Sequence, residues 1–327
     1  MKKQLANTFA AMATVAIGAL ASFGAQAQEW PERAITVVVP FAAGGGADPV
    51  ARTVAEGIQE AFGQPVVVDF RPGANGTIGA NIVAQAEPDG YTLLITSPAP
   101  LVNVKFGQKL PYDPDGDLVS ITQIADAPYL LTASGKFPAN TLQELVDYAK
   151  AHPGEVNAGV SGLGGLSHLS TVILQEATGT KLTPIPYDGV GERIADLMAG
   201  TIDISTGIGA SGFQAGIQDG SIKPLVVMGD TRVPELPDTP TVIEAGYPNA
   251  ISSGWYMLSA PQDFPPELVK KLNEAVVAYL NRADIKDKFI KFGNMVKTST
   301  PEEAEALIQR ETTVLKDLVD RGVFTVQ

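Results

Sequence analysis

The sequence predicts an α/β fold in two lobes, each a mostly parallel sheet flanked by helices. Two successive series of short β-branched strands alternate with amphipathic helices, which is the order that a parallel, helix-covered sheet requires. The strands are continuous apolar runs, typical of strands buried on both faces. No low-complexity linker separates the two series. We therefore expect two lobes joined by extended crossings of the chain.

The first series begins with a strand at residues 37–39, which leads into a glycine-rich turn. Asp48 and Pro49 then have the residue types of an N-cap and a first helical position. The apolar residues that follow recur at helical spacing as far as Gly63. A strand at residues 66–68 completes a βαβ unit, and a helix at 78–86 and a strand at 91–95 continue it.

The second series repeats this order. It begins with a strand at residues 129–133 and a helix at 141–151, where Thr141 and Glu144 match a capping box. Further strands are predicted at 156–159, 182–185, 202–205 and 222–227, and further helices at 166–178, 190–199 and 213–218.

The last third of the chain returns to longer helices, at residues 265–281 and 302–321, the second opened by a capping box of Thr300 and Glu303. We expect this part to fold back onto the first lobe. Crossings near 121–124 and 225–228 would divide the chain into lobe 1, residues 28–124 and 229–327, and lobe 2, residues 125–228.

Composition excludes several classes of protein. Of 327 residues, 45% are hydrophobic and 18% charged, which excludes long-range disorder. The net charge of −13 argues against nucleic acid as a partner. The chain has no cysteine, which excludes disulfides, thiolate nucleophiles and cysteine-ligated metals. No pattern predicts a cofactor or a metal site.

The N-terminal segment has the pattern of a signal peptide. Lys2 and Lys3 precede an apolar run at residues 10–23, and Ala25 and Ala27 are the small residues that a signal peptidase requires. We expect cleavage after Ala27, so that the mature chain starts at Gln28 in the periplasm. The run is too short to span a bilayer, which needs about 20 apolar residues.

The Gly44-Gly45-Gly46 turn has two interpretations. Backbone N–H groups between a strand and a helix N-terminus can form an anion cradle, or the glycines can serve only a tight turn. The turn lacks the Lys-Ser/Thr pair of a phosphate loop, so a nucleotide is not indicated.

Two other motifs give only weak evidence of a binding site. Gly207, Gly209 and Gly212 match the dinucleotide spacing, but an exported protein meets no nicotinamide pool, so a loop at the lobe edge is preferred. Asp113, Asp115 and Asp117 resemble a calcium loop without its Gly and Glu, which favours a turn.

Ser161 and His168 could form a nucleophile–base pair, but Leu163 replaces the second glycine of a GxSxG elbow. We expect His168 instead to position the loop at residues 161–165 by a hydrogen bond.

Many short motifs in a fixed order resemble one family over residues 29–327. They are Trp30-Pro31, Val39-Pro40-Phe41-Ala42-Ala43-Gly44-Gly45, Arg71-Pro72-Gly73-Ala74, Pro88-Asp89-Gly90-Tyr91, Leu110-Pro111-Tyr112-Asp113-Pro114, Ser167-His168-Leu169, Pro186-Tyr187, Leu236-Pro237-Asp238-Thr239-Pro240-Thr241, Glu244-Ala245-Gly246 and Ala260-Pro261. The chain is similar to the periplasmic solute-binding proteins of tripartite tricarboxylate transporters, the Bug family.

The resemblance implies a type II periplasmic-binding-protein clamshell that closes on a small carboxylate and delivers it to integral-membrane transporter subunits. It places the ligand between the loops at residues 41–48 and 160–167. We expect the protein to be a monomer. The expected ligand-binding residues are Phe41, Ala43, Gly44, Gly45, Gly46, Asp48, Ser97, Ser161, Gly162, Gly164, Ser167, His168, Tyr187 and Gly207.

Departures from the family pattern suggest the ligand's chemistry. Gly46-Ala47 stands where many relatives have Ser-Thr, Leu163 and Leu166 replace polar residues, and Gly207 stands where amino-acid binders have Asp. A ligand ammonium would be left buried and unpaired there. The resemblance thus implies a di- or tricarboxylate without an ammonium group, with an apolar or aromatic body such as terephthalate.

We expect one carboxylate to be held by the N–H groups of Ala43 to Gly46, and a second polar end or a bridging water by Ser161 and Ser167. A side chain at Gly45 would strain any positive φ there. Two other functions stay open at this point: a periplasmic hydrolase using Ser161 and His168, and a ligand sensor for a membrane kinase.

Overall fold

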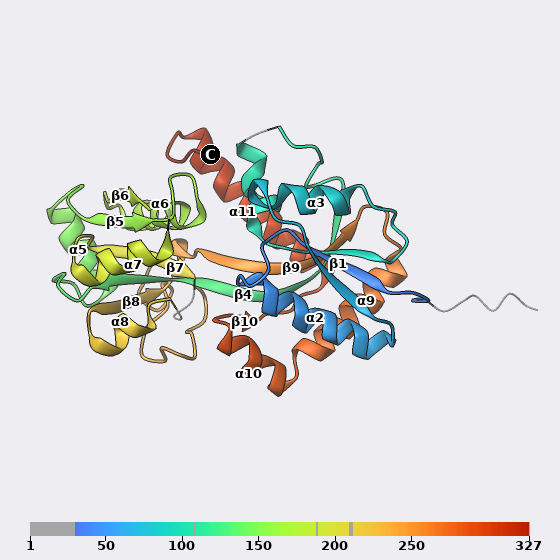
Figure 1. Ribbon diagram of the computed structural model, residues 1–327. Coiled ribbons are helices and arrows are strands. Elements are labelled where there is room, and N and C mark those ends of the chain that lie inside the picture. The colour runs from blue at the N-terminus through green and yellow to red at the C-terminus, as the bar shows by residue number, and fades with distance from the viewer. Residues whose placement is uncertain (1–29, 108, 188, 209–211, 327) are drawn as a thin grey trace, which may run out of the picture.

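The computed structural model describes residues 30–107, 109–187, 189–208 and 212–326. It places them in two α/β lobes, as predicted (Figure 1). The expected signal peptide lies outside the described residues. No helix in the part of the chain that is described combines the length and apolarity needed to cross a membrane.

The first lobe is built on strands β1 (Ile35–Val39), β2 (Val66–Phe70) and β3 (Thr92–Thr96), which are mutually parallel in the order β2-β1-β3. Val37 and Val39 pack toward one face, against α2 (Ala47–Phe62) and α9 (Pro266–Leu280). Val38 packs toward the other, against α3 (Thr77–Ala84) and α11 (Pro301–Asp320). Residues 37–39 of the strand are all valine because both faces are covered there.

The second lobe repeats this arrangement with β5 (Asn157–Val160), β6 (Thr183–Pro186) and β7 (Ile204–Ile208), parallel in the order β7-β5-β6. Strand β8 (Ile222–Val227) pairs antiparallel with β4 (Leu118–Ser134). The helices are α5 (Leu142–Ala151), α6 (Leu166–Thr178), α7 (Val190–Ala199) and α8 (Gln214–Asp219).

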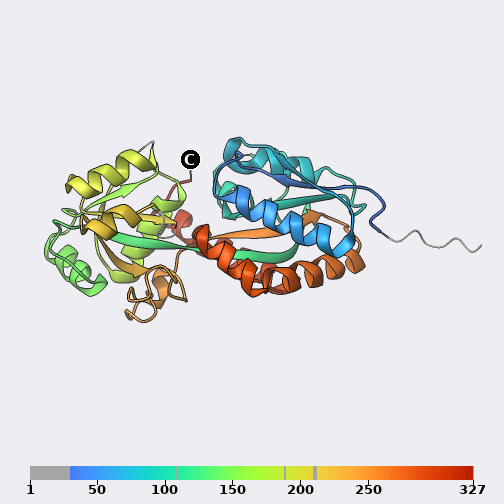
Figure 2. The ribbon, with the colours of Figure 1, turned by 60° about the horizontal axis from the view of Figure 1, so that its bottom comes forward.

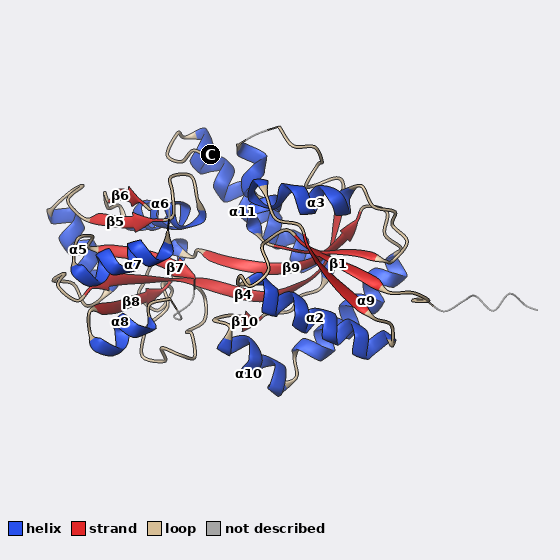
Figure 3. Ribbon diagram, in the orientation of Figure 1, coloured by secondary structure: helices blue, strands red, loops and turns tan. Residues whose placement is uncertain are grey.

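Two long antiparallel strands join the lobes. Strand β4 runs through both sheets, and β9 (Ser253–Pro261) pairs with it from Leu118 opposite Pro261 to Pro128 opposite Ser253 (Figure 3). Each sheet is therefore mixed rather than mostly parallel. Strand β4 makes the first crossing, and residues 121–124, where the sequence placed it, pack in the core of the first lobe. The second is β9, and not residues 225–228, which belong to β8 and its end in the second lobe.

The segment between β8 and β9 packs with the second lobe. Val242 and Ala250 share a buried cluster with Tyr129 and Leu131, and Val233 shares one with Phe213. We therefore propose that the second lobe extends to about residue 252, so that residues 229–252 belong to it rather than to lobe 1.

The last third returns to the first lobe, as predicted, with α9 and α10 (Ala283–Lys291) beside α2 (Figure 2). The short strand β10 (Met295–Val296) pairs with β4. At its end α11 reaches the second lobe, where Arg321 contacts Glu176 of α6 at 2.6 Å. The remaining elements are α4 (Pro98–Leu101) and three 3₁₀ turns, Ala74–Gly76, Asn103–Phe106 and Pro248–Ala250.

Candidate functional site

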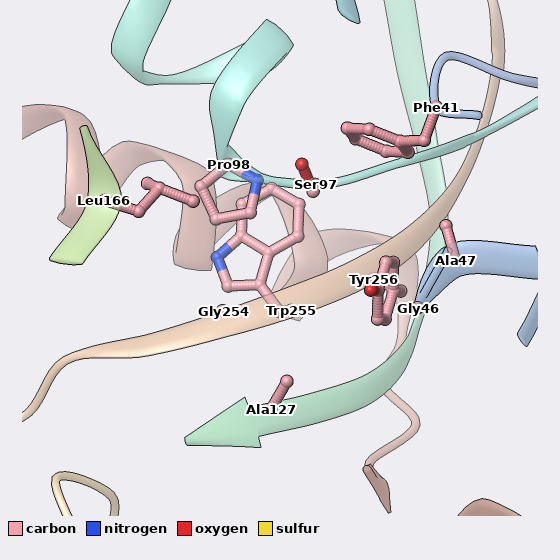
Figure 4. Close-up of a pocket in the computed structure, with 10 residues that line it drawn as sticks. All are labelled: Phe41, Gly46, Ala47, Ser97, Pro98, Ala127, Leu166, Gly254, Trp255 and Tyr256. Atoms are coloured by element: carbon pink, nitrogen blue, oxygen red, sulfur yellow. The ribbon is translucent and has the colours of Figure 1, made fainter. Parts of the chain in front are cut away.

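A cavity of about 200 Å³ lies between the lobes, against the crossing strands (Figure 4). The first lobe contributes the loop between β1 and α2 and the start of α4, the second lobe contributes the start of α6, and β4 and β9 form the floor. The lining residues are Phe41, Gly46, Ala47, Ser97, Pro98, Ala127, Leu166, Gly254, Trp255 and Tyr256.

The walls of this cavity are largely apolar. The phenyl ring of Phe41, the indole of Trp255 and the side chain of Leu166 line it from three different elements (Figure 4). Trp255 is among the largest fully buried side chains and is held between the sheet and α11. Because buried rings hold one orientation, the cavity has a defined shape, which suits a small ligand with an apolar body.

In the glycine-rich loop at residues 41–48, some backbone N–H groups donate to acceptors within the same segment. The Asp48 carboxylate accepts the Gly44 N–H at 2.7 Å and contacts Arg52 at 2.5 Å, and the Gly45 N–H donates to the Ala42 carbonyl at 3.3 Å. The Gly44 N–H lowers the pKa of Asp48, and Arg52 contributes in the same direction. Among the described residues, no protein acceptor faces the N–H of Ala43 or Gly46.

Two details of this loop differ from the prediction. The N-cap of α2 is Gly46 rather than Asp48, because the Asp48 side chain bonds back to Gly44 from within the first turn. The positive φ is at Gly44, where it is +79°, rather than at Gly45. A Cβ at Gly46 would lie 3.2 Å from the Tyr256 hydroxyl, so this glycine keeps the cavity open.

The second predicted loop is a compact hydrogen-bonded turn. The Ser167 hydroxyl accepts the Ser161 N–H at 2.7 Å and lies 2.8 Å from the Ser161 Oγ. His168 accepts the Gly164 N–H through Nδ1 at 3.0 Å, which confirms its predicted role in positioning the loop. Burial lowers the pKa of His168, so the neutral ring that this bond requires is favoured. Ser161 is thus paired with Ser167 and not with a base.

The remaining predicted residues do not line this cavity. Gly162 and Gly164 have positive φ in the second loop. The Tyr187 hydroxyl donates to Asp196 of α7 at 2.6 Å. Gly207 pairs with Leu130 in the sheet, where a Cβ would lie 2.7 Å from the ring of Phe213. Gly209 of the dinucleotide-like motif lies outside the described residues.

Sequence reasoning missed the floor and one wall of the cavity. Ala127, Gly254 and Trp255 come from the crossing strands, and Pro98 comes from a short helix that no pattern predicted. Ala127, Gly254 and Pro98 have no polar side-chain group, so the role of Ala127 and Gly254 depends on the pairing of β4 with β9. In the calcium-like segment, the Asp117 carboxylate accepts the Asp113 N–H at 2.7 Å, which confirms a turn. The described residues hold no group of three or more metal-ligating side chains.

Two α/β lobes joined by crossing strands, with a cavity between them, define a solute-binding protein. The family model described as "Tripartite tricarboxylate transporter family receptor" matches residues 50–322, and the chain belongs to this family. Members are periplasmic receptors that bind substrates for transport, so the chain is a receptor and not an enzyme.

Individual relatives agree with this assignment. Protein BugT of Bordetella pertussis is 34% identical over 87% of this chain and 88% of its own length. The structure "R. palustris Rpa4515 with adipate" has a TM-score of 0.74 and 31% identity, covering 91% of this chain and 100% of that one. The MatC protein of Rhodopseudomonas palustris with bound malate has a TM-score of 0.69 and 32% identity, covering 89% and 100%.

Proposed function

We propose that this receptor captures a small dicarboxylate between its lobes and delivers it to the membrane subunits of a tripartite transporter. The proposal rests on the cavity. Its walls are apolar and come from both lobes, and it borders a loop in which the N–H groups of Ala43 and Gly46 have no acceptor among the described residues.

The site favours an anion without an ammonium group. The N–H groups of Ala43 and Gly46 lie beside the start of α2, where the helix dipole adds to the attraction for a carboxylate. Among the cavity-lining residues, none carries a carboxylate that would pair with an amine. Adipate and malate, bound by two relatives, are dicarboxylates of this chemistry. Terephthalate matches the aromatic walls, and we propose it as one member of the class.

A thermal-shift and calorimetric panel tests this function. Adipate, malate and terephthalate should raise the melting temperature of the mature protein, because a ligand at 100 times its Kd stabilises by about 2.7 kcal/mol. Lysine and glutamate serve as ammonium-bearing controls. Tighter binding of either amino acid than of adipate, malate and terephthalate would contradict the proposal.

A variant of the loop tests the site. Gly46→Ala places a methyl group beside Tyr256 in the cavity and should weaken dicarboxylate binding at least tenfold. Gly63→Ala, at the far end of α2, is the control and should leave the affinity unchanged. Equal affinity of the Gly46 variant and the wild type would place the ligand elsewhere.

We also propose that residues 1–27 are removed on export, and that the mature receptor acts as a monomer. The N-terminal motif supports the first statement. Size-exclusion chromatography with light scattering at micromolar concentration tests the second.

A further inference from the structure

Arg193 is a buried cation whose guanidinium is only partly satisfied. The residue lies in the first turn of α7 and is 4% exposed. Its Nε and Nη1 atoms are buried and have no hydrogen-bond partner among the described residues. Burying an unpaired charge costs free energy. A buried guanidinium is therefore expected where an anion pairs with it.

The carboxylates of α7 do not supply that partner. Asp196 accepts the hydroxyl of Tyr187, and Glu192 is exposed to solvent. Burial lowers the pKa of Arg193, and among the described residues the phenol of Tyr129 acts in the opposite direction. The guanidinium therefore stays charged without a carboxylate of the described chain beside it.

Two glycines make room for this side chain on the sheet. A Cβ at Gly159 of β5 would lie 3.0 Å from the Arg193 Cγ, and a Cβ at Gly207 of β7 would lie 3.6 Å from its Nη2. The stem thus crosses β5 and the guanidinium reaches β7. Gly207 pairs with Leu130 of β4.

The start of α7 lies at the edge of the lobe that faces the cavity. Strands β5, β6 and β7 are parallel, so the loop at residues 161–165 and the start of α7 share one edge of the sheet. A Cβ at Gly189 or Gly191 would meet no atom within 4 Å. Figure 2 shows α7 (yellow) and α2 (blue) on the same side of the crossing strands.

We propose that Arg193 and the first turn of α7 form a carboxylate subsite in the second lobe, which binds the end of the ligand remote from the Gly46 loop. The N-cap Gly189 has no side-chain cap, so the helix N-terminus adds N–H donors beside the guanidinium. This inference rests on the proposed function and narrows it: the receptor selects dicarboxylates over monocarboxylates of the same body. A ligand with two carboxylates then links the two lobes and stabilises their closure.

The test uses two matched ligand pairs, adipate with hexanoate and terephthalate with benzoate. Calorimetry would compare the wild type with Arg193→Met, which keeps the apolar stem, and with Arg193→Lys, which keeps the charge. We expect the wild type to prefer the dicarboxylate of at least one pair. Arg193→Met should weaken binding of that dicarboxylate at least 100-fold and binding of the matched monocarboxylate less than threefold. Arg193→Lys should restore part of the preference for the dicarboxylate.

The melting temperature of the ligand-free proteins separates a binding role from a structural one. Removing an unpaired buried charge should leave the melting temperature of Arg193→Met equal to or above that of the wild type. A lower melting temperature, or equal losses for both members of a pair, would show that Arg193 supports the fold. An unchanged preference for dicarboxylates in Arg193→Met would overturn this subsite alone. If no carboxylate binds the wild type, the proposed function fails, and this inference with it.

Discussion

His168 accepts the backbone N–H of Gly164 through its Nδ1 atom over 3.0 Å, so the first turn of α6 holds the loop that precedes it. The same ring lies 5.3 Å from that of Phe324 in the C-terminal segment, which follows α11. The loop with Ser161 and Ser167 is thereby connected to an element that begins in the other lobe. His168 therefore contacts both the loop and the C-terminal segment.

His168→Phe should weaken ligand binding while leaving the protein folded. The phenyl ring keeps the contact with Phe324 but cannot accept the Gly164 N–H, which costs about 1 kcal/mol of loop stability. We expect a loss of affinity of roughly fivefold to tenfold by calorimetry. His152→Phe is the matched control, because His152 ends α5 away from the cavity. Similar losses in both variants would show a general effect on the fold.

The pH dependence of stability has a definite sign at this residue. Burial holds the pKa of His168 below its ordinary value, so the unfolded chain takes up a proton before the folded chain does. The stabilisation by His168 is complete above pH about 6.5 and declines as the pH falls toward the folded-state value. Melting temperatures measured from pH 8 to pH 5 should fall more steeply for the wild type than for His168→Phe. Parallel curves would contradict this assignment.

Gly44→Ala and Gly63→Ala form a matched pair that separates stability from binding. Both glycines have left-handed backbone, with φ of +79° and +73°, and a Cβ at either would meet no atom within 4 Å. Each substitution should therefore lower the free energy of unfolding by about 1 kcal/mol, measured in urea. Only Gly44→Ala should also reduce ligand affinity, because strain there displaces the loop that Asp48 holds. An affinity loss in Gly63→Ala would refute this separation.

N-terminal sequencing of the exported protein tests the predicted processing. The expected first residue is Gln28, since Ala25 and Ala27 supply the small residues before the cleavage point. Ala27→Leu should block cleavage and leave the precursor associated with the membrane fraction. Recovery of functional periplasmic protein that still begins at Met1 would contradict the prediction.

Local patterns were sufficient to predict most of the helices. Thr141 and Thr300 accept the N–H groups of Glu144 and Glu303, as their spacing predicts, since a capping box involves residues within one helical turn. The crossing strand β9 was missed for the opposite reason. Its partner is β4, distant in sequence, and only tertiary pairing distinguishes Ser253–Pro261 from an ordinary apolar strand.

The site could be predicted only where backbone chemistry marks it. The loop at residues 41–48 is recognisable because glycines follow a strand and precede a helix, and Phe41 and Gly46 do line the cavity. Arg193 gave no such signal, because a single arginine near the start of an amphipathic helix is usually solvated. Its burial depends on Gly159 and Gly207, which make room on two neighbouring strands.

Lys297→Met should destabilise the junction between the lobes. Lys297 lies beside β10 in the first lobe and contacts Asp126 of β4 at 3.2 Å and Asp230 of the segment that packs with the second lobe at 3.0 Å. Asp126 is 5% exposed. Burial raises the pKa of Asp126, and the Lys297 ammonium offsets part of that effect. Without the lysine, the carboxylate loses a charged hydrogen-bond partner, and we expect a loss of about 2 kcal/mol in unfolding free energy at pH 7.

The pH dependence of the stability loss in Lys297→Met shows whether the loss comes from the unpaired charge of Asp126 or from lost packing. Without Lys297 the folded-state pKa of Asp126 rises further above the unfolded value of about 3.9. The folded protein then binds its proton more tightly than the unfolded chain, so the cost of the substitution is small in acid and grows as the pH rises to 7. Asp126→Asn combined with Lys297→Met removes the unpaired charge and should recover most of the lost stability. Urea unfolding of the wild type, both single variants and the double variant at pH 4 and pH 7 measures this coupling. A loss that is equal at both pH values, and that the double variant does not relieve, would mean that Lys297 acts through its apolar stem and not through its charge.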